Sequence, residues 1–169
     1  MPLGFGSRRG RTTGRLLGGT ALAALLALGA ALVSQHGFDM QPCPWCVLQR
    51  LIFVVIAGVC AVGWAVRHVA FRRVTAGLAL LLAVCGIAAA LWQHFKAAAS
   101  ASCNLTLADK IVSGALHLDS LLPEVFAVRA SCADAAVDLL GVPYDLWSLA
   151  LFAAMAAAMV VAAQRAGGR

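Results

Sequence analysis

Four long apolar stretches divide the chain and limit what it can fold into. They cover residues 16–34, about 44–66, 74–95 and 146–164, and the only formal charge inside them is that of Arg50. A helix of about 20 apolar residues crosses the roughly 30 Å of hydrocarbon in a bilayer. The stretches therefore predict an all-α integral membrane protein built as a four-transmembrane-helix bundle.

The composition agrees with this fold class. The chain is 62% hydrophobic and 12% charged, whereas a soluble domain carries about 25% charged residues. The net charge is +6. In a membrane protein the positions of the charges along the chain are more informative than their sum, so we expect no nucleic-acid partner. A signal peptide is the alternative for the first stretch, but its apolar core usually has only about 7–15 residues. We therefore expect residues 1–169 to form a single membrane domain.

The charges are distributed unequally between the connecting segments. Nine arginines lie in the tail 1–15, in the loop 67–73 and after the fourth stretch, and these segments contain no Asp or Glu. All seven acidic residues lie in two other loops, about 35–43 and 96–145. Because positively charged segments stay in the cytoplasm, both termini are predicted to be cytoplasmic and the two acidic loops periplasmic.

Two of these segments carry further expectations. The tail 1–15 holds four arginines among Gly, Ser and Thr, and we expect it to be a flexible basic tail. The long periplasmic loop has an irregular apolar pattern that predicts a short amphipathic helix around 106–116, lying on the membrane surface. A long loop with its own apolar face usually serves the function of the protein.

A Cys-x-x-Cys pair stands at the start of the second stretch. If Cys43 is the N-cap of the helix, Pro44 falls at the first helical position, where a missing N–H costs nothing. Cys46 then lies in the first turn, where the helix dipole favours the thiolate. Arg50 follows four residues later and projects from the same face. Since Cys43 can close a disulfide with Cys46, the pattern indicates a dithiol that transfers electrons.

The polar groups of the apolar stretches are gathered at one depth. We place six of them within about two helical turns of the periplasmic interface, at about 1.5 Å of rise per residue: Gln35, His36, Cys43, Cys46, Arg50 and His94. Helices packed at crossing angles of about 20° hold such groups around one shared space. We therefore expect a pocket that opens toward the outer leaflet.

Two further cysteines, Cys103 and Cys132, lie in the long periplasmic loop. A disulfide that only staples this loop is one interpretation. A second pair on the same side of the membrane as Cys43 and Cys46 favours thiol–disulfide exchange between the pairs. The two remaining cysteines, Cys60 and Cys85, are interpreted as small apolar fillers of their helices.

Other meanings of the Cys-x-x-Cys pair fit less well. A zinc site needs a second pair of ligands at metal spacing, so we expect no metal. Covalent haem needs a histidine after the second cysteine, where Val47 stands. A purely structural disulfide is the remaining alternative. Arg50 argues against it, because an arginine within the hydrocarbon is costly and usually functional, although a snorkelling side chain stays possible.

Taken together, these residues resemble the bacterial disulfide bond formation protein DsbB family over nearly the whole chain after the basic tail. The motifs that carry the resemblance are Gln35-His36, Pro42-Cys43-x-x-Cys46-x-x-x-Arg50, His94, Cys103, Cys132, Leu140-Gly141 and Trp147. The resemblance implies a quinone-dependent thiol oxidoreductase of the bacterial inner membrane. Its partner would be a DsbA-like periplasmic oxidase of the thioredoxin fold, and its role disulfide bond formation.

The resemblance also implies a relay. Reduced DsbA would attack a disulfide between Cys103 and Cys132, joining to Cys103. Cys132 would then attack Cys43 and leave Cys46 as the thiolate, which would donate to a bound quinone through a charge-transfer complex. The resemblance assigns the quinone site to Arg50, His94, Gln35 and Cys46. The quinone would be ubiquinone or menaquinone, reoxidised by the respiratory chain.

Two other functions fit the sequence less well. A vitamin K epoxide reductase-like enzyme shares the four-helix design, but there the loop pair precedes the Cys-x-x-Cys motif, whereas here it follows. A membrane assembly factor with structural disulfides is the non-enzymatic alternative. The sequence departs from the family mainly in the loop between Cys103 and Cys132, and Pro44-Trp45 between the paired cysteines bears on their redox potential.

Overall fold

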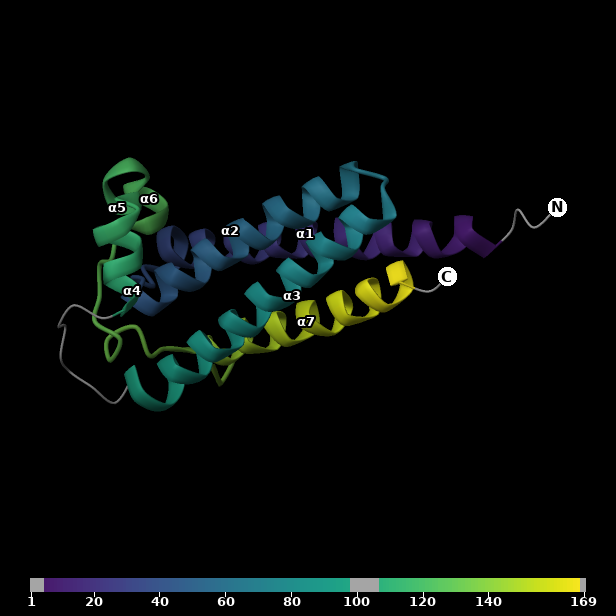
Figure 1. Cartoon of the computed structure of the whole chain (residues 1–169). Helices are drawn as coiled ribbons and strands as arrows, with labels where there is room; N and C mark the ends of the chain where they lie inside the picture. Colours follow the sequence, from purple (N-terminus) through teal and green to yellow (C-terminus); the bar gives the residue numbers. More distant parts are fainter. Residues whose placement is uncertain (1–4, 98–106, 168–169) are drawn as a thin grey trace.

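Four long helices make up most of the protein. The computed structural model describes residues 5–97 and 107–167. The long helices are α1 (Phe5–Phe38), α2 (Pro44–Ala65), α3 (Val69–Trp92) and α7 (Tyr144–Gly167), as Figure 1 shows. Each of them is long and apolar enough to cross a membrane. The predicted helical architecture is therefore confirmed, and its four long apolar helices are consistent with four membrane spans.

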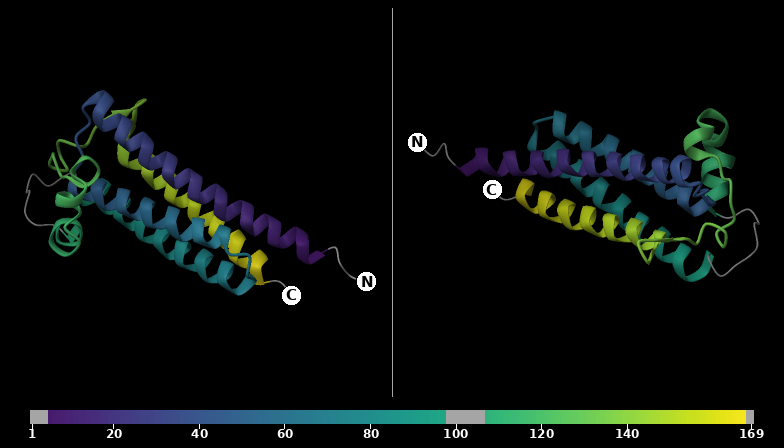
Figure 2. Two further views of the ribbon diagram at one scale, coloured as in Figure 1. Left: turned by 90° about the horizontal axis from the view of Figure 1, so that it is seen from above. Right: turned by 180° about the vertical axis from the view of Figure 1, so that it is seen from behind.

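The helices form a bundle in which neighbours along the chain are also neighbours in space. α1 packs against α2 and α7, and α3 packs against α2 and α7. The N-terminal end of α1 and the C-terminal end of α7 lie at one end of the bundle, as both views in Figure 2 show. Residues 107–143, which lead to α7, lie at the opposite end of the bundle (Figure 1).

The core of the bundle is packed through small residues. Ala76, Ala79 and Ala83 of α3 are fully buried, which lets neighbouring backbones approach as membrane helices prefer. At Gly86 a Cβ atom would come within 2.5 Å of the Phe152 ring, so only glycine admits that ring between α3 and α7. The ring also stacks on Phe53 at a centroid distance of 4.2 Å.

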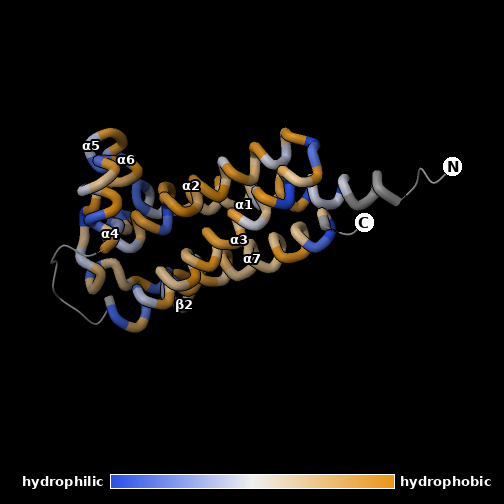
Figure 3. Tube along the Cα trace, in the orientation of Figure 1, coloured by the Kyte–Doolittle hydropathy of each residue, from blue (hydrophilic) through white to orange (hydrophobic). Residues whose placement is uncertain are grey.

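Apolar side chains also cover the outside of the bundle. Leu22, Leu26, Val74 and Leu81 are all more than half exposed, and Figure 3 shows apolar residues along the length of all four helices. Water would penalise such a surface. A lipid bilayer is the solvent in which this surface is stable.

Some helix bounds differ from the sequence predictions. α1 begins at Phe5, so residues 5–15 are helical, and the expectation of a flexible tail over 1–15 is wrong for them. Arginine is a good helix former, and the Arg72 guanidinium donates a hydrogen bond to the Gly10 carbonyl at 2.7 Å, which holds this end of α1. α3 begins at Val69 rather than 74, which shortens the basic loop.

The segment between α3 and α7 is a chain of short elements. A π-helical turn, η1 (Gln93–Ala97), extends α3. Further along lie α4 (Leu107–Asp109), a second π-helical turn η2 (Lys110–Ala115), α5 (Leu118–Leu121) and α6 (Pro123–Phe126). α4 and η2 fall where the sequence predicts an amphipathic helix. Ala108, Val112 and Phe126 are buried against the first turns of α2. This segment therefore covers the N-terminal end of that helix.

A small hairpin leads into α7. Its strands β1 (Asp138–Leu139) and β2 (Val142–Pro143) pair antiparallel, with Leu139 opposite Val142. Leu140 and Gly141 between them both have positive φ, 57° and 76°, as a two-residue hairpin turn requires. The indole of Trp147 donates to the Leu139 carbonyl at 3.2 Å, which fastens the hairpin to the start of α7.

Candidate redox site

The N-terminus of α2 positions the Cys-x-x-Cys pair. Cys43 is the N-cap with extended backbone, and Pro44 takes the first helical position, as the sequence predicts. The Cys46 N–H donates to the Cys43 sulfur at 3.3 Å, and the two sulfurs lie 2.7 Å apart. The positive end of the helix dipole faces this pair and favours sulfur in its thiolate form.

A third cysteine of the predicted site reaches the same place from the long loop. The N–H groups of Arg129 and Ala130 both donate to the Pro42 carbonyl, at 3.0 and 3.3 Å. These bonds hold the loop over the start of α2 and bring the Cys132 sulfur into hydrogen-bonding contact with Cys43. Cys43 is completely buried beneath this contact, so only Cys132 and Cys46 have immediate access to its sulfur among the cysteines that the structure describes.

The contact gives the two thiols different acidities. The side-chain hydrogen bonds of Cys43 with Cys132 and Cys46, together with burial, raise the pKa of Cys43. The hydrogen bond from Cys43 lowers the pKa of Cys132, and the Trp45 backbone N–H at the helix N-terminus acts in the same direction. Cys132 is therefore favoured as the thiolate of this pair, and a thiolate is the attacking form in disulfide exchange.

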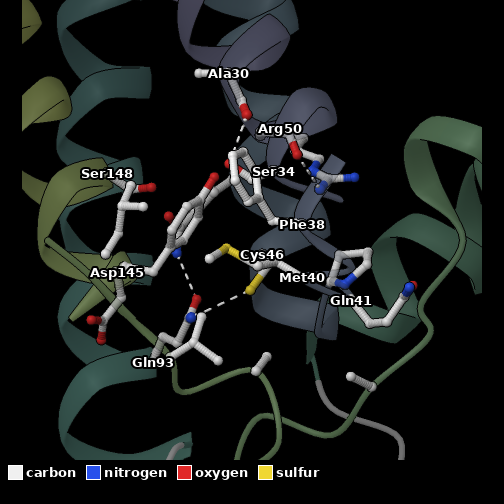
Figure 4. A pocket seen from close by; sticks show the side chains of 18 of the residues that line it. Ala30, Ser34, Phe38, Met40, Gln41, Cys46, Arg50, Gln93, Asp145 and Ser148 are labelled. Atoms are coloured by element: carbon white, nitrogen blue, oxygen red, sulfur yellow. Dashed lines mark hydrogen bonds between the residues drawn. The ribbon is translucent and has the colours of Figure 1, made fainter. Parts of the chain in front are cut away.

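On its other side, Cys46 faces a cavity of about 530 Å³ that lies between α1, α2, Gln93 of η1, the loop residues 129–139 and the start of α7. Figure 4 shows Cys46 beside Gln93, with Ser34 and Ala30 of α1 across the cavity. Its walls combine apolar side chains with a few polar ones; among them are Ala27, Ala30, Phe53, Leu151, Gln49, Arg50, Gln93, Tyr144, Asp145 and Ser148. This size and this lining are typical of a small-molecule site.

Arg50 lies on the wall of this cavity and is 5% exposed. Its guanidinium donates to Gln35 Oε1 at 2.6 Å, to the Val125 carbonyl at 2.9 Å and to the Ala31 carbonyl at 3.3 Å. All three acceptors are neutral, so these bonds orient the guanidinium without cancelling its charge. Gln35 in turn donates to the Glu124 carbonyl at 3.4 Å. The predicted pair Gln35 and Arg50 therefore links α1 and α2 to α6.

Two glutamines of the site were not singled out from the sequence. The Gln93 amide donates to the Cys46 sulfur at 3.4 Å, and the Gln49 amide donates to Gln93 Oε1 at 2.8 Å. Both side chains are buried. Gln93 begins the π-helical turn η1, a feature that is frequent at functional sites. The sequence does contain a signal for them: Gln49 directly precedes Arg50, and Gln93 directly precedes His94, each inside an apolar stretch.

The predicted histidines lie at different distances from the cavity. His94 Nδ1 is 2.9 Å from Asp145 Oδ2, and Asp145, but not His94, lines the cavity. His36 is half exposed and lies 3.7 Å from Glu124, on the outside of the bundle. It therefore does not join the shared pocket expected for it. Cys103 lies outside the described residues.

A metal centre finds no support in the part of the chain that the structure describes. There, no three His, Cys, Asp or Glu side chains are placed to hold an ion. Cys60 is buried, and its sulfur lies 3.9 Å from the Met159 sulfur. Cys85 is exposed on the outer face of α3. Both are remote from the cavity lining.

A membrane bundle with a Cys-x-x-Cys pair at a helix N-terminus, a loop cysteine against it and a cavity beside it defines a membrane-embedded thiol oxidoreductase. The family model described as Disulfide bond formation protein DsbB matches residues 13–162. The chain belongs to the DsbB family. It is a multi-pass protein of the bacterial inner membrane and a quinone-dependent oxidant of DsbA in disulfide bond formation.

The relatives cover most of the chain. A disulfide bond formation protein B of Herminiimonas arsenicoxydans is 34% identical over 137 residues, which is 80% of this chain and 85% of the relative. The protein of the same name from Burkholderia pseudomallei is 31% identical over 156 residues, 92% of both chains. No solved structure gives a significant match. The family membership favours the quinone-dependent oxidase over the vitamin K epoxide reductase-like enzyme and the assembly factor.

Proposed function

We propose that four cysteines of this chain form a two-step relay from a periplasmic DsbA-like dithiol to a quinone bound beside Cys46. The observation that carries the proposal is the position of the Cys-x-x-Cys pair between two neighbours. Cys43 contacts Cys132 of the loop, and Cys46 lines the cavity. Electrons can therefore enter the pair at one sulfur and leave it at the other.

In the first half of the relay, a DsbA thiolate attacks Cys103 of a Cys103–Cys132 disulfide. The old S–S bond breaks, a mixed disulfide with DsbA forms, and Cys132 leaves as the thiolate. Cys132 then attacks Cys43 of the Cys43–Cys46 disulfide, which forms a Cys43–Cys132 bond and releases Cys46 as the thiolate. The Trp45 backbone N–H at the helix N-terminus favours the thiolate of Cys132, which supports its role as the attacking group at this step.

The second half restores the loop pair. The second DsbA thiolate attacks the mixed disulfide, so that oxidised DsbA leaves and Cys103 becomes a thiolate. Cys103 attacks Cys132 in the Cys43–Cys132 bond, which re-forms the loop disulfide and leaves Cys43 and Cys46 reduced. In sum, DsbA has lost two electrons and two protons, and the Cys43/Cys46 dithiol holds them.

The cavity suits a quinone headgroup by its chemistry. Apolar walls from α1 and α7 fit a planar ring and an isoprenoid tail, and the Arg50 guanidinium supplies a positive charge for a carbonyl oxygen that gains electron density. A quinone bound there supplies a two-electron, two-proton acceptor that returns Cys43 and Cys46 to the disulfide. Ubiquinone and menaquinone both have this chemistry.

Other polar residues orient or stabilise the reacting groups of this site. Gln35 orients the Arg50 guanidinium through their 2.6 Å hydrogen bond. Gln93 donates to Cys46 and so stabilises it as the leaving thiolate, while Gln49 fixes the Gln93 amide. His94 and Asp145 form a hydrogen-bonded pair at the cavity wall, from which His94 can exchange a proton with the loop side.

The orientation follows from charge. Nine arginines and no Asp or Glu stand in the segments at the end of the bundle that carries both termini, and the positive-inside rule places this end in the cytoplasm. The redox site then faces the periplasm, where a soluble DsbA-like oxidase can reach the loop, and the respiratory chain reoxidises the quinol within the bilayer.

The proposed function is tested with purified protein, a reduced DsbA-like oxidase and a soluble ubiquinone or menaquinone analogue. We expect quinone to be reduced at half the rate at which DsbA thiols disappear, with one quinone reduced per dithiol oxidised. A preparation that oxidises DsbA without consuming quinone, or that reduces quinone without DsbA oxidation, would refute the coupled relay.

Arg50→Gln is expected to lower kcat/KM for the quinone by roughly 10²-fold, because removing one preorganised charge donor from such a site has an effect of about this size. Arg50→Lys keeps the charge but not the three-way hydrogen bonding, and its rate should lie between those of the wild type and Arg50→Gln. The measurement is quinone-dependent turnover at varied quinone concentration. If the Arg50→Gln variant has wild-type kinetics, Arg50 only connects the helices through its hydrogen bonds and has no role in quinone reduction.

A further inference from the structure

A second cavity lies at the opposite end of the bundle from the redox site. It has a volume of about 660 Å³ and is an open hollow lined by residues 10–15 of α1, the last turn of α2 and the start of α3. Four of the residues that line it are arginines: Arg11, Arg15, Arg67 and Arg72. None of them takes part in the relay.

Glycines of α1 make room for this cavity. Gly10, Gly14 and Gly18 follow one another at intervals of four residues and therefore lie on one face of the helix. A Cβ atom at Gly14 would come within 3.2 Å of the Arg72 guanidinium, and one at Gly18 within 3.1 Å of the Trp64 ring. This face of α1 thus lets an arginine and a tryptophan of the α2–α3 connection approach its backbone.

Arg72 is held in place without losing its charge. Its guanidinium donates to the carbonyls of Gly10 at 2.7 Å, Trp64 at 3.1 Å and Val66 at 3.0 Å. These three acceptors are neutral, so the positive charge of Arg72 adds to those of the arginines at the rim. The backbone of two helices and their connection therefore preorganises a cationic site.

The chain itself provides no Asp or Glu to balance these charges. All seven acidic residues lie at position 39 or between 109 and 145, in the segments at the other end of the bundle. Arginines gathered in a concave site without carboxylates match the oxygens of a phosphate group, which they bind by paired N–H donors. The lining of this cavity is therefore suited to an anionic ligand.

We propose that the cavity binds the phosphate group of an anionic phospholipid, such as phosphatidylglycerol or cardiolipin. Charge alone would also suit free phosphate, but the surroundings are those of a lipid. Trp64 is 59% exposed, as interfacial tryptophans are, and Val66, Val69 and Phe71 beside the cavity are exposed as well. A headgroup can occupy the arginines while its acyl chains lie on these apolar side chains.

The proposal is tested by lipid binding and is independent of the relay. Delipidated full-length protein in neutral detergent is titrated with phosphatidylglycerol, phosphatidylcholine, inorganic phosphate or glycerol phosphate, and bound lipid is counted by native mass spectrometry. We expect saturable binding of phosphatidylglycerol at low stoichiometry and much weaker binding of phosphatidylcholine. Equal binding of the two lipids, or displacement of phosphatidylglycerol by inorganic phosphate or glycerol phosphate at equal concentration, would overturn the proposal.

Matched double variants locate the site. Arg15→Gln/Arg67→Gln removes two charges from the cavity, and Arg73→Gln/Arg165→Gln removes two exposed charges from the same end of the bundle outside it. At about 1 kcal/mol per arginine, the first pair should weaken phosphatidylglycerol binding by roughly 30-fold, and the second pair by far less. Arg15→Lys/Arg67→Lys should retain most of the binding. If both Gln variants weaken phosphatidylglycerol binding equally, the lipid responds to the general surface charge and the cavity is not its binding site.

Discussion

Replacing Cys46 by alanine is expected to abolish quinone reduction while leaving the helix bundle intact. Cys46 is the sulfur of the pair that lines the cavity, so without it no thiolate faces the electron acceptor. Cys43 in the variant can still form a disulfide with Cys132, because the two sulfurs are in contact. We therefore expect turnover to fall at least about 10³-fold, as for loss of a covalent catalyst, with DsbA oxidised at most once per protein.

The matched control is Cys60→Ala, in the same helix. Cys60 is also buried, but it packs against Met159 in the bundle core and does not line the cavity. Its variant should retain wild-type turnover, with a modest loss of thermal stability from the small cavity left behind. Steady quinone reduction by Cys46→Ala would remove Cys46 from the relay, and equal inactivation by both variants would point to a general loss of structure.

Local patterns in the sequence predicted the start of α2 well. A cysteine followed by proline and an uninterrupted apolar run defines the N-cap and the first turn by backbone chemistry alone. The same logic placed Arg50 on the face of Cys46, because residues four apart share a helix face. The four spans were predictable for a similar reason, since a bilayer demands about 20 consecutive apolar residues of each.

Contacts between distant segments could not be predicted in this way. Nothing in the local sequence indicates that the N–H groups of Arg129 and Ala130 meet the Pro42 carbonyl, yet these bonds bring Cys132 to Cys43. Gln49 and Gln93 are 44 residues apart, and each alone has the appearance of an ordinary polar residue near an interface. Gln93 begins the π-helical turn η1, and the position of such a rare turn is not indicated by local propensity.

The buried glutamines and Arg50 together suggest why the site tolerates polar groups within a membrane. Every guanidinium contact of Arg50 that the structure gives is to a neutral oxygen, and the Gln93 amide is used on both sides, by Gln49 and by Cys46. Buried polar groups that are hydrogen-bonded avoid most of their desolvation cost. The site can therefore keep one positive charge close to Cys46, where negative charge develops during exchange.

Replacing Cys132 by alanine is expected to separate the two halves of the relay. DsbA-dependent turnover should fall at least about 10³-fold, because no loop sulfur then contacts Cys43, which is otherwise buried. Quinone reduction driven by a small dithiol such as dithiothreitol should persist, since the Cys43/Cys46 pair and its cavity are unchanged. The measurement compares the two electron donors in one quinone-reduction assay, and non-reducing gels should show no DsbA–Cys103 mixed disulfide, because Cys103 then has no disulfide for DsbA to attack.

Two comparisons make this expectation decisive. Cys85→Ala, on the exposed face of α3, removes a thiol without touching the relay and should behave as the wild type with both donors. In the wild type, the DsbA-driven rate should rise with pH, because each exchange step needs an attacking thiolate. If Cys132→Ala still oxidises DsbA at the wild-type rate, electrons reach Cys43 by another route, and the contact between the two sulfurs has no part in the transfer.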